Sequence, residues 1–274
     1  MIEIKKFKKK IMSVILISSI MTIIIPIITM IIWAFTNNYV WPNVLPNSFG
    51  MRGIDYVYKN FPRVIMTLKN SVIISTMTTI LTIIISIPCA KALAFEDFRG
   101  KKAVELLIMT PLIIPMVSVS MGLNVEFIKL GIAGTYTGII IVCILPCIPY
   151  SVSMIRNVYK IVGKKVFEQG LVLGASKTQV LFKLVIPMIM PGILSAGIMC
   201  YIISFSQYFL VLLIGGGRII TFTMDMFPFI ESGDRMIGSI YGIIFILSTV
   251  VLLIIMEYIL KKLYMKDLED YKYI

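Results

Sequence analysis

This 274-residue sequence contains Gly-Lys pairs and a Gly-Ala-Ser group, residue types that occur in ATP-hydrolysing loops and in serine hydrolases. Neither set has the spacing that its chemistry requires. A phosphate-binding loop needs a glycine five residues before its Gly-Lys-Ser/Thr group, because backbone amides of the loop surround the phosphates. The two Gly-Lys pairs begin at Gly100 and Gly163, and Phe95 and Val158 stand where that upstream glycine would be. Ser176 follows Gly-Ala and lacks the Gly-x-Ser-x-Gly pattern of a nucleophile elbow. The sequence therefore predicts that this chain is not an enzyme.

The cysteines could suggest a metal site or a disulfide. Cys143 and Cys147 are one helical turn apart, and the other two cysteines are Cys89 and Cys200. All four lie within apolar runs, where a thiol behaves as a small apolar side chain. The chain has no histidine to complete a zinc-type ligand set. We therefore expect no metal and no cofactor bound by this chain.

A loop of polar and small residues has the pattern of a protein contact. Residues 164–173 predict a short helix with an apolar face of Val166, Phe167, Leu171 and Val172, and Glu168 points away from that face. Glycine enters the left-handed conformation without penalty, so Gly174 is expected to end this helix. The small residues Gly170, Gly174, Ala175 and Ser176 would let another protein approach closely. Gln169 and Pro187 complete the group of candidate contact residues.

A second short helix is expected after this turn. Ser176 is a good N-cap, and Gln179 stands three residues later as its capping-box partner. Pro187 and Pro191 are expected to break or redirect the chain where it enters the next apolar run. The segment 164–186 thus predicts a helix–turn–helix, and a bare amphipathic hairpin at the membrane surface remains an alternative interpretation.

A few polar residues within the apolar runs could line a path for a solute. An amide or hydroxyl in lipid needs a partner, although serine often bonds to its own helix. The candidates are Ser118, Ser120, Asn124, Ser204, Ser206 and Gln207.

Long uncharged segments must position these residues. The composition is 58% apolar, and six stretches of about 20 residues or more lack any charge, which is enough to cross a membrane as helices. The sequence predicts an all-α membrane protein that forms a single permease domain over residues 1–274. Its six expected spans cover about 11–35, 68–94, 104–128, 137–159, 188–214 and 236–260.

The distribution of positive charge predicts the orientation of these spans. If the N-terminus is inside, 19 of the 26 Lys and Arg residues fall on inner segments. The positive-inside rule therefore places both termini and the 164–186 loop in the cytoplasm. The net charge of +12 follows from this bias, so we expect membrane lipid as a partner and no nucleic acid.

At the 164–186 loop the sequence resembles the inner-membrane permease subunits of ATP-binding-cassette importers. Their signature is a Glu followed by two small residues, a Gly six residues after the Glu, and an Ile/Leu-Pro near the end. Here these are Glu168, Gly174 and Ile186-Pro187, and Gln169 departs from the usual Ala. The resemblance extends to 111–115 and 204–217 and implies the type I importer permease fold.

The resemblance also implies partners and a mechanism. The 164–186 segment would form coupling helices that dock on a cytoplasmic ATP-binding subunit present in two copies, with Glu168 as polar anchor and Gly174 as the turn. A second permease subunit and an extracytoplasmic solute-binding protein would complete the importer in the cell membrane. ATP would be used by the partner subunit.

The solute and the alternatives are less defined. The sequence looks most similar to the polyamine, phosphonate, thiamine and ferric-iron branch, but Ser206 and Gln207 are neutral where polyamine members often carry acids. A sugar-type permease is a further alternative within the family. Outside it, a stand-alone carrier or channel would need intramembrane charge or a paired repeat. Neither is evident in the sequence, since Glu105, Glu126 and Glu257 lie near the ends of the expected spans.

Overall fold

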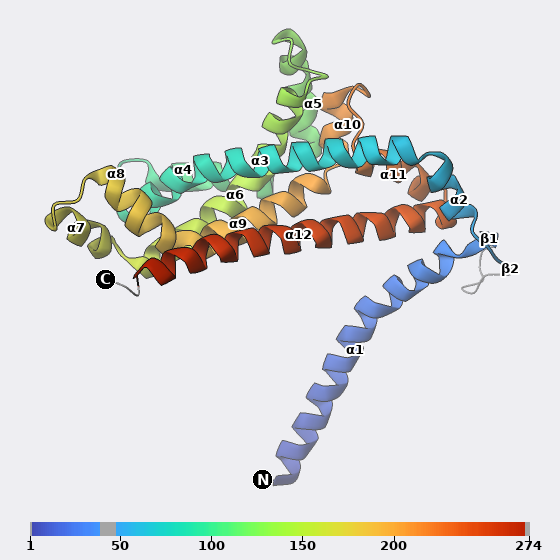
Figure 1. Ribbon diagram of the computed structural model, residues 1–274, viewed down its shortest axis with the longest axis horizontal. Helices are drawn as coiled ribbons and strands as arrows, with labels where there is room; N and C mark the ends of the chain where they lie inside the picture. The colour runs from blue at the N-terminus through green and yellow to red at the C-terminus, as the bar shows by residue number, and fades with distance from the viewer. Residues whose placement is uncertain (1, 39–47, 272–274) are drawn as a thin grey trace. The chain divides into compact units, whose positions relative to one another are not determined.

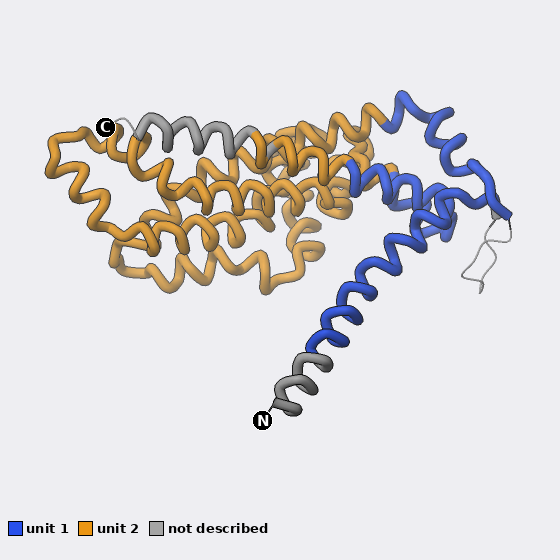
Figure 2. Tube along the Cα trace, turned by 60° about the horizontal axis from the view of Figure 1, so that its bottom comes forward, with its two compact units in different colours: residues 1–64, 226–247 blue, residues 65–225, 248–274 orange. Residues whose placement is uncertain are grey.

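The computed structural model describes residues 2–38 and 48–271, and nearly all of them are helical. Contacts between Cα atoms divide the chain into two compact units, residues 1–64 with 226–247 and residues 65–225 with 248–274 (Figure 2). The elements of the first half are α1 (Ile2–Ala34), β1 (Thr36–Asn38), β2 (Ser48–Phe49), α2 (Arg52–Lys59), α3 (Phe61–Phe95), α4 (Lys101–Ile113) and α5 (Met116–Lys129). Those of the second half are α6 (Tyr136–Val162), α7 (Lys164–Val172), α8 (Lys177–Gln179), a π-helical turn η1 (Val180–Val185), α9 (Ile186–Phe205), α10 (Phe209–Gly215), α11 (Phe222–Glu231) and α12 (Arg235–Tyr271).

Within residues 2–38 and 48–271, five helical segments are long and apolar enough to cross a membrane, and there are six if the bent pair α4–α5 forms one span. The span expected over about 104–128 corresponds to the two helices α4 and α5. The chain turns by 102° between α4 and α5. The cause is local: Pro115 disfavours the helical conformation at the residue before it, and Ile114 accordingly has an extended backbone with ψ 131°.

The helix expected over about 188–214 is also interrupted. α9 ends at Phe205 and α10 begins at Phe209. Hydrogen bonds hold the chain at this break: the Ser206 hydroxyl donates to the Ile202 carbonyl oxygen at 2.9 Å, and the Thr223 hydroxyl donates to the Gln207 carbonyl oxygen at 3.0 Å. These bonds provide partners for the carbonyl oxygens of Ile202 and Gln207 where the helix is interrupted within an apolar segment.

The larger unit is built around the pair α6 and α9, which have the most extensive contact of any two helices (Figure 1). One apolar cluster includes Val142 of α6 and Ile214 of α10, and a second includes Tyr159 of α6 and Ile189 of α9. α5 packs against α10, whereas the α7–α8 turn lies at the opposite end of α6 and α9. The unit therefore has two distinct ends, each built from short helices.

The smaller unit contains α1, α2, the beginning of α12 and a short antiparallel pairing of β1 with β2, which an all-α prediction does not include. Gly53 of α2 lies against α12, where an added Cβ would be 2.9 Å from a side-chain carbon of Ile240. Arg52 and Asp234 form a 2.9 Å ion pair. Most of the apolar stretch Met12–Ala34 of α1 is not buried within the chain, although Ala34 at its end is buried.

Candidate functional site

The α7–α8 turn begins with a helix end that is closed by backbone hydrogen bonds. α7 ends at Val172, and Gly174 adopts φ 86°. The Gly174 N–H donates to the Leu171 carbonyl at 3.0 Å, and the Ala175 N–H donates to the Gly170 carbonyl at 3.2 Å. This pair of bonds is a Schellman motif, which requires a left-handed residue at the position of Gly174. The expected role of Gly174 in ending the helix is confirmed.

The next helix begins with the expected capping box. The Gln179 N–H donates to the Ser176 hydroxyl at 3.3 Å, and the Ser176 N–H donates to the Gln179 side-chain oxygen at 2.9 Å. Together with the Schellman motif, these bonds satisfy groups at both helix ends without any other protein. The turn is therefore formed in the isolated chain.

The chain then continues into the membrane without a break, contrary to the expectation for its prolines. α8, η1 and α9 form one apolar helical segment from Lys177 to Phe205. In the π-helical turn the Ile186 N–H donates to the Leu181 carbonyl, five residues earlier. Pro187 follows directly in the first turn of α9, and Pro191 lies inside that helix. Wider turns of this kind let a membrane helix accept proline, because they provide other partners for the backbone.

Gly170 has a different role from the one the sequence suggested. It is buried, and an added Cβ would be 3.0 Å from one methyl of Val180 and 3.3 Å from a methyl of Leu184. The absence of a side chain thus allows α7 to pack directly on η1. Its small size serves contact within the chain and does not form an open surface for another protein, so this expectation is corrected.

α7 also contacts α3. The ammonium group of Lys91 lies 3.9 Å from the ring centroid of Phe167, which is a cation–π contact. Phe167, Leu171 and Ala175 pack against the cluster that contains Tyr159. α7 is consequently held by α3, by η1 and by the end of α6.

The outer surface of the turn combines one carboxylate with apolar side chains. Glu168 is exposed, and Val172, one turn later on the same face, is 87% exposed. Leu173 is 86% exposed. Val172 was expected on the packed face of α7, and this was wrong because the packed face is formed by Val166, Phe167 and Leu171. Gln169 and Ser176 are exposed as well.

The candidate path residues lie on two segments of the larger unit. On α5, Ser118 is exposed, Asn124 is half-buried, and Ser120 is buried with its hydroxyl donating to the Val117 carbonyl at 2.7 Å. Ser204 is buried beside Cys143 of α6. Ser206 and Gln207 form the break between α9 and α10, and α10 packs on α5.

A polar connection that the sequence did not indicate lies at the opposite end of the larger unit from the α7–α8 turn. The buried Asn70 of α3 donates to the Ile220 carbonyl at 2.9 Å and accepts from the Tyr136 hydroxyl at 2.8 Å. A nearby hydroxyl, that of Ser71, accepts from the Phe222 N–H at 2.8 Å. These bonds join α3 to the beginning of α6 and to residues 220–222, where α11 begins.

A row of buried hydroxyls along α3 was missed too. The residues recur every three or four positions, which places them on one helix face. This spacing could have revealed the row in the sequence. The row consists of Thr67, Ser71, Ser75, Thr78, Thr82 and Ser86.

These features define a helical membrane protein with a preformed surface turn between two long apolar helices. Residues 82–264 match the family model described as the binding-protein-dependent transport system inner membrane component. The chain belongs to this family, whose members are membrane components of transport systems.

Individual relatives differ in the solutes that their names state. The chain is 31% identical over 153 residues to the molybdate/tungstate transport system permease protein WtpB of Pyrococcus abyssi, covering 56% of this chain and 61% of that protein. It is 25% identical to the trehalose/maltose transport system permease protein MalG of Thermococcus litoralis, with 69% of each covered. The match thus spans about three fifths of the length of the WtpB relatives.

A solved structure has the same fold. A chain from the crystal structure of a bacterial ABC transporter involved in the import of the acidic polysaccharide alginate aligns with a TM-score of 0.69 at 16% identity. The alignment covers 94% of this chain and 96% of that one. The protein therefore has the type I importer permease fold that the sequence predicted.

Proposed function

We propose that this chain is a permease subunit of an ATP-driven importer, in which the α7–α8 turn docks on a cytoplasmic ATP-binding subunit. The observation that carries the proposal is a turn with satisfied helix ends that exposes Glu168, Val172 and Leu173. Exposed aliphatic side chains at a fixed turn cost free energy in water unless a partner covers them. Membership of the transport family supports such a partner.

Docking would use the two kinds of side chain differently. Val172 and Leu173 would enter an apolar groove of the ATP-binding subunit, and Glu168 would pair with a cation or backbone amide at its rim. Gly174 would hold the turn, with Ala175 and Ser176 bringing the chain back toward the membrane. Gln169, beside Glu168, would face the same subunit.

The contacts of α7 suggest how movement would pass to the membrane helices. The Gly170 contact connects α7 to η1 and therefore to α9, since Lys177–Phe205 is one continuous segment. The Lys91–Phe167 contact connects α7 to α3. A displacement of α7 by the ATP-binding subunit would thus shift both helices.

The complete importer would contain two ATP-binding subunits, a second permease and an extracytoplasmic solute-binding protein. Both termini and the α7–α8 turn would be cytoplasmic, in agreement with the distribution of Lys and Arg. This chain would bind no cofactor, and ATP would be hydrolysed by the partner subunit. Serines 118, 120, 204 and 206 with Asn124 and Gln207 remain the proposed lining of the path.

For the solute we propose a small oxyanion such as molybdate or tungstate. The WtpB relatives support this class. The candidate path residues are hydroxyls and amides, which can donate hydrogen bonds to an anion. One alternative class of solute is that of the polyamine, phosphonate, thiamine and iron branch. Sugars are another, and MalG is a relative whose name states sugars. One binding assay can compare all of these classes.

The test is purification of the tagged chain in a mild detergent, with mass spectrometry of the proteins bound to it. We expect an ATP-binding subunit and a second permease to co-purify. Val172→Ser combined with Leu173→Ser, and separately Glu168→Ala, should reduce the yield of the ATP-binding subunit while membrane insertion is retained. The matched control is Leu130→Ser, since Leu130 is also exposed but lies far along the chain from the turn.

Two outcomes would contradict the proposal. If the chain purifies alone in every detergent, the turn is a bare amphipathic hairpin and a stand-alone carrier or channel becomes the better interpretation. Equal retention of the ATP-binding subunit by wild type and variants would remove the docking role of the turn. The co-purified binding protein, titrated with molybdate, putrescine and maltose, decides the solute class.

A further inference from the structure

The larger unit has two separate apolar clusters. The α10 cluster includes Ile214 of α10, Val142 in the first half of α6 and Phe127 of α5. The α9 cluster includes Ile189 of α9 and Tyr159 near the end of α6. The two clusters share no residue, so the unit consists of two packed bodies that are connected by the helices passing from one to the other.

Three of these connections are interrupted or weakened. Between α4 and α5 the chain turns by 102° at Ile114–Pro115, so that α5 leaves α4 at a steep angle (Figure 1). Between α9 and α10 the helix is interrupted over residues 206–208. α6 is continuous, but it contains Pro146 and Pro149, and a proline has no N–H to bond with the carbonyl four residues earlier.

The three weakened connections lie close together. A cavity of about 330 Å³ is enclosed by α4, α5 and α6, and its lining includes Ile114 at the bend and Leu145 and Ile148 of α6. The bend therefore lies at the level of the two prolines of α6. Ser204, just before the interruption of α9, lies beside Cys143, within about one turn of the first of these prolines.

The helices that pass this level without a break have few strong bonds there. Cys147 of α6 and Cys200 of α9 are buried, and each thiol donates to the carbonyl oxygen of the other residue, at 3.6 and 3.7 Å. A thiol is only a weak donor. On α3, between the parts that belong to the two clusters, none of the described residues bonds to the buried hydroxyls of Ser75, Thr78 and Ser86.

We propose that the larger unit bends at this level, so that the α10 cluster rotates relative to the α9 cluster and the cavity beside Ile114 changes in volume. α4 would stay with the α9 cluster, because Ile108 packs on that cluster and a 2.6 Å ion pair joins Glu105 to Arg156 of α6. α5 would move with α10, on which it packs. The bend is a property of this chain alone and does not depend on the proposed importer function.

The length of α5 sets the scale of the movement. Its 14 residues measure about 21 Å, so a change of about 15° at the bend would move its far end by about 5 Å. α5 carries Ser118, Ser120 and Asn124, whereas Ser204 lies on α9. If these residues line the path, as proposed above, the bend would change the width of the path within a single permease subunit.

The test measures distances between spin labels that are attached to non-canonical amino acids, so the native cysteines stay in place. One label replaces Leu106 of α4 and the other Ile128 of α5, which are 63% and 62% exposed. The full chain, purified with its bound subunits, is placed in lipid nanodiscs without nucleotide. We expect a distance distribution about 5 Å wider than that of a control pair at Leu106 and Ile161, both of which belong to the side of the α9 cluster.

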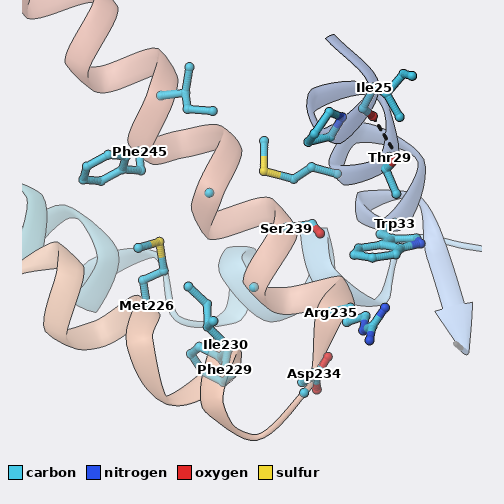
Figure 3. Close-up of a pocket in the computed structure, with 16 residues that line it drawn as sticks. Ile25, Thr29, Trp33, Met226, Phe229, Ile230, Asp234, Arg235, Ser239 and Phe245 are labelled. Atoms are coloured by element: carbon cyan, nitrogen blue, oxygen red, sulfur yellow. Dashed lines mark hydrogen bonds between the residues drawn. The ribbon is translucent and has the colours of Figure 1, made fainter. Parts of the chain in front are cut away.

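Two variants should stiffen the bend. Val119→Phe places a larger side chain in the cavity from α5, and Pro146→Ala restores an N–H to α6, so each should narrow the distribution toward that of the control pair. The matched control fills a different cavity, of about 760 Å³, which lies in the smaller unit and is lined by α1, α11 and α12 (Figure 3). Gly238→Leu in that cavity should leave the distribution unchanged, since an added Cβ there meets its nearest neighbour at 3.7 Å.

Each outcome decides the proposal. A wild-type distribution as narrow as that of the control pair would show that the two clusters form one rigid body, and this would overturn the bend. Equal broadening of the control pair would show general loosening of the helices and would overturn it too. A broad distribution that ATP with vanadate does not shift would support the bend and count against coupling to an ATP-binding subunit, whereas a shifted distribution would support both.

Discussion

Gly174 offers a prediction whose size can be worked out from the structure. Its φ of 86° is in the left-handed region, and an added Cβ would meet nothing within 4 Å. The cost of Gly174→Ala is therefore a backbone cost alone, about 1–2 kcal/mol for an L-residue in this region. A change of this size lowers the ratio of formed to unformed turn by about 5–30-fold. Asparagine tolerates the left-handed conformation better, so Gly174→Asn should cost less.

Two measurements test this prediction: hydrogen exchange reports whether the turn is formed, and ATP-driven uptake reports whether transport depends on it. Hydrogen exchange of a peptide covering residues 170–180 reports the Schellman bonds, because the Gly174 and Ala175 amides exchange only when the turn opens. Protection should decrease in the order wild type, Asn, Ala. ATP-driven uptake in proteoliposomes should decrease in the same order if the turn is the coupling element.

Gly100→Ala is the matched control for this series. Gly100 has φ 87° and open space around an added Cβ, so its substitution has the same backbone cost at a different turn. We expect it to leave the hydrogen exchange of residues 170–180 and the ATP-driven uptake unchanged. Unaltered protection in Gly174→Ala would refute the backbone reasoning, and an equal loss of uptake in both variants would refute a specific role for the α7–α8 turn.

Three further substitutions test other contacts. Glu105→Gln disrupts a partly buried 2.6 Å ion pair and should lower the stability measured by thermal unfolding by about 1–2 kcal/mol, more than Glu126→Gln at a largely exposed pair. Ser176→Ala removes the N-cap and should cost about 1 kcal/mol, seen as faster exchange in α8. Asn70→Ala leaves buried partners unsatisfied and should destabilise by about 1–3 kcal/mol, with Tyr136→Phe at the lower end; equal stability to wild type would show that this connection contributes nothing.

The parts of the site that were predictable are those that neighbouring residues determine. The capping box of Ser176 and Gln179 and the left-handed Gly174 depend on residues within one turn, so spacing alone identified them. The apolar runs likewise predicted the membrane helices, because length and hydropathy suffice for a span.

Features that depend on distant residues were not predictable in this way. Gly170 is small because Val180 and Leu184 pack on it, and no pattern around residue 170 indicates this. The bond between Tyr136 and Asn70 joins residues 66 apart in sequence. The bend at Pro115 was not predicted from the sequence, and Pro187 was expected to break or redirect the chain, whereas the π-helical turn allows it within a continuous helix. In each case tertiary packing or backbone re-pairing decided the result.

The continuous segment Lys177–Phe205 has a consequence for the scale of any movement. At 1.5 Å per residue its 29 residues form a lever about 43 Å long. A tilt of about 5° about its loop end would carry Phe205 through about 4 Å, which is about three quarters of the height of one helical turn. The π-helical turn lies close to the loop end of this segment. Bending at this turn would therefore reduce the displacement of Phe205 less than bending farther along the helix. A small displacement at the membrane surface would thus be magnified at the interrupted end of α9, beside Ser206 and Gln207.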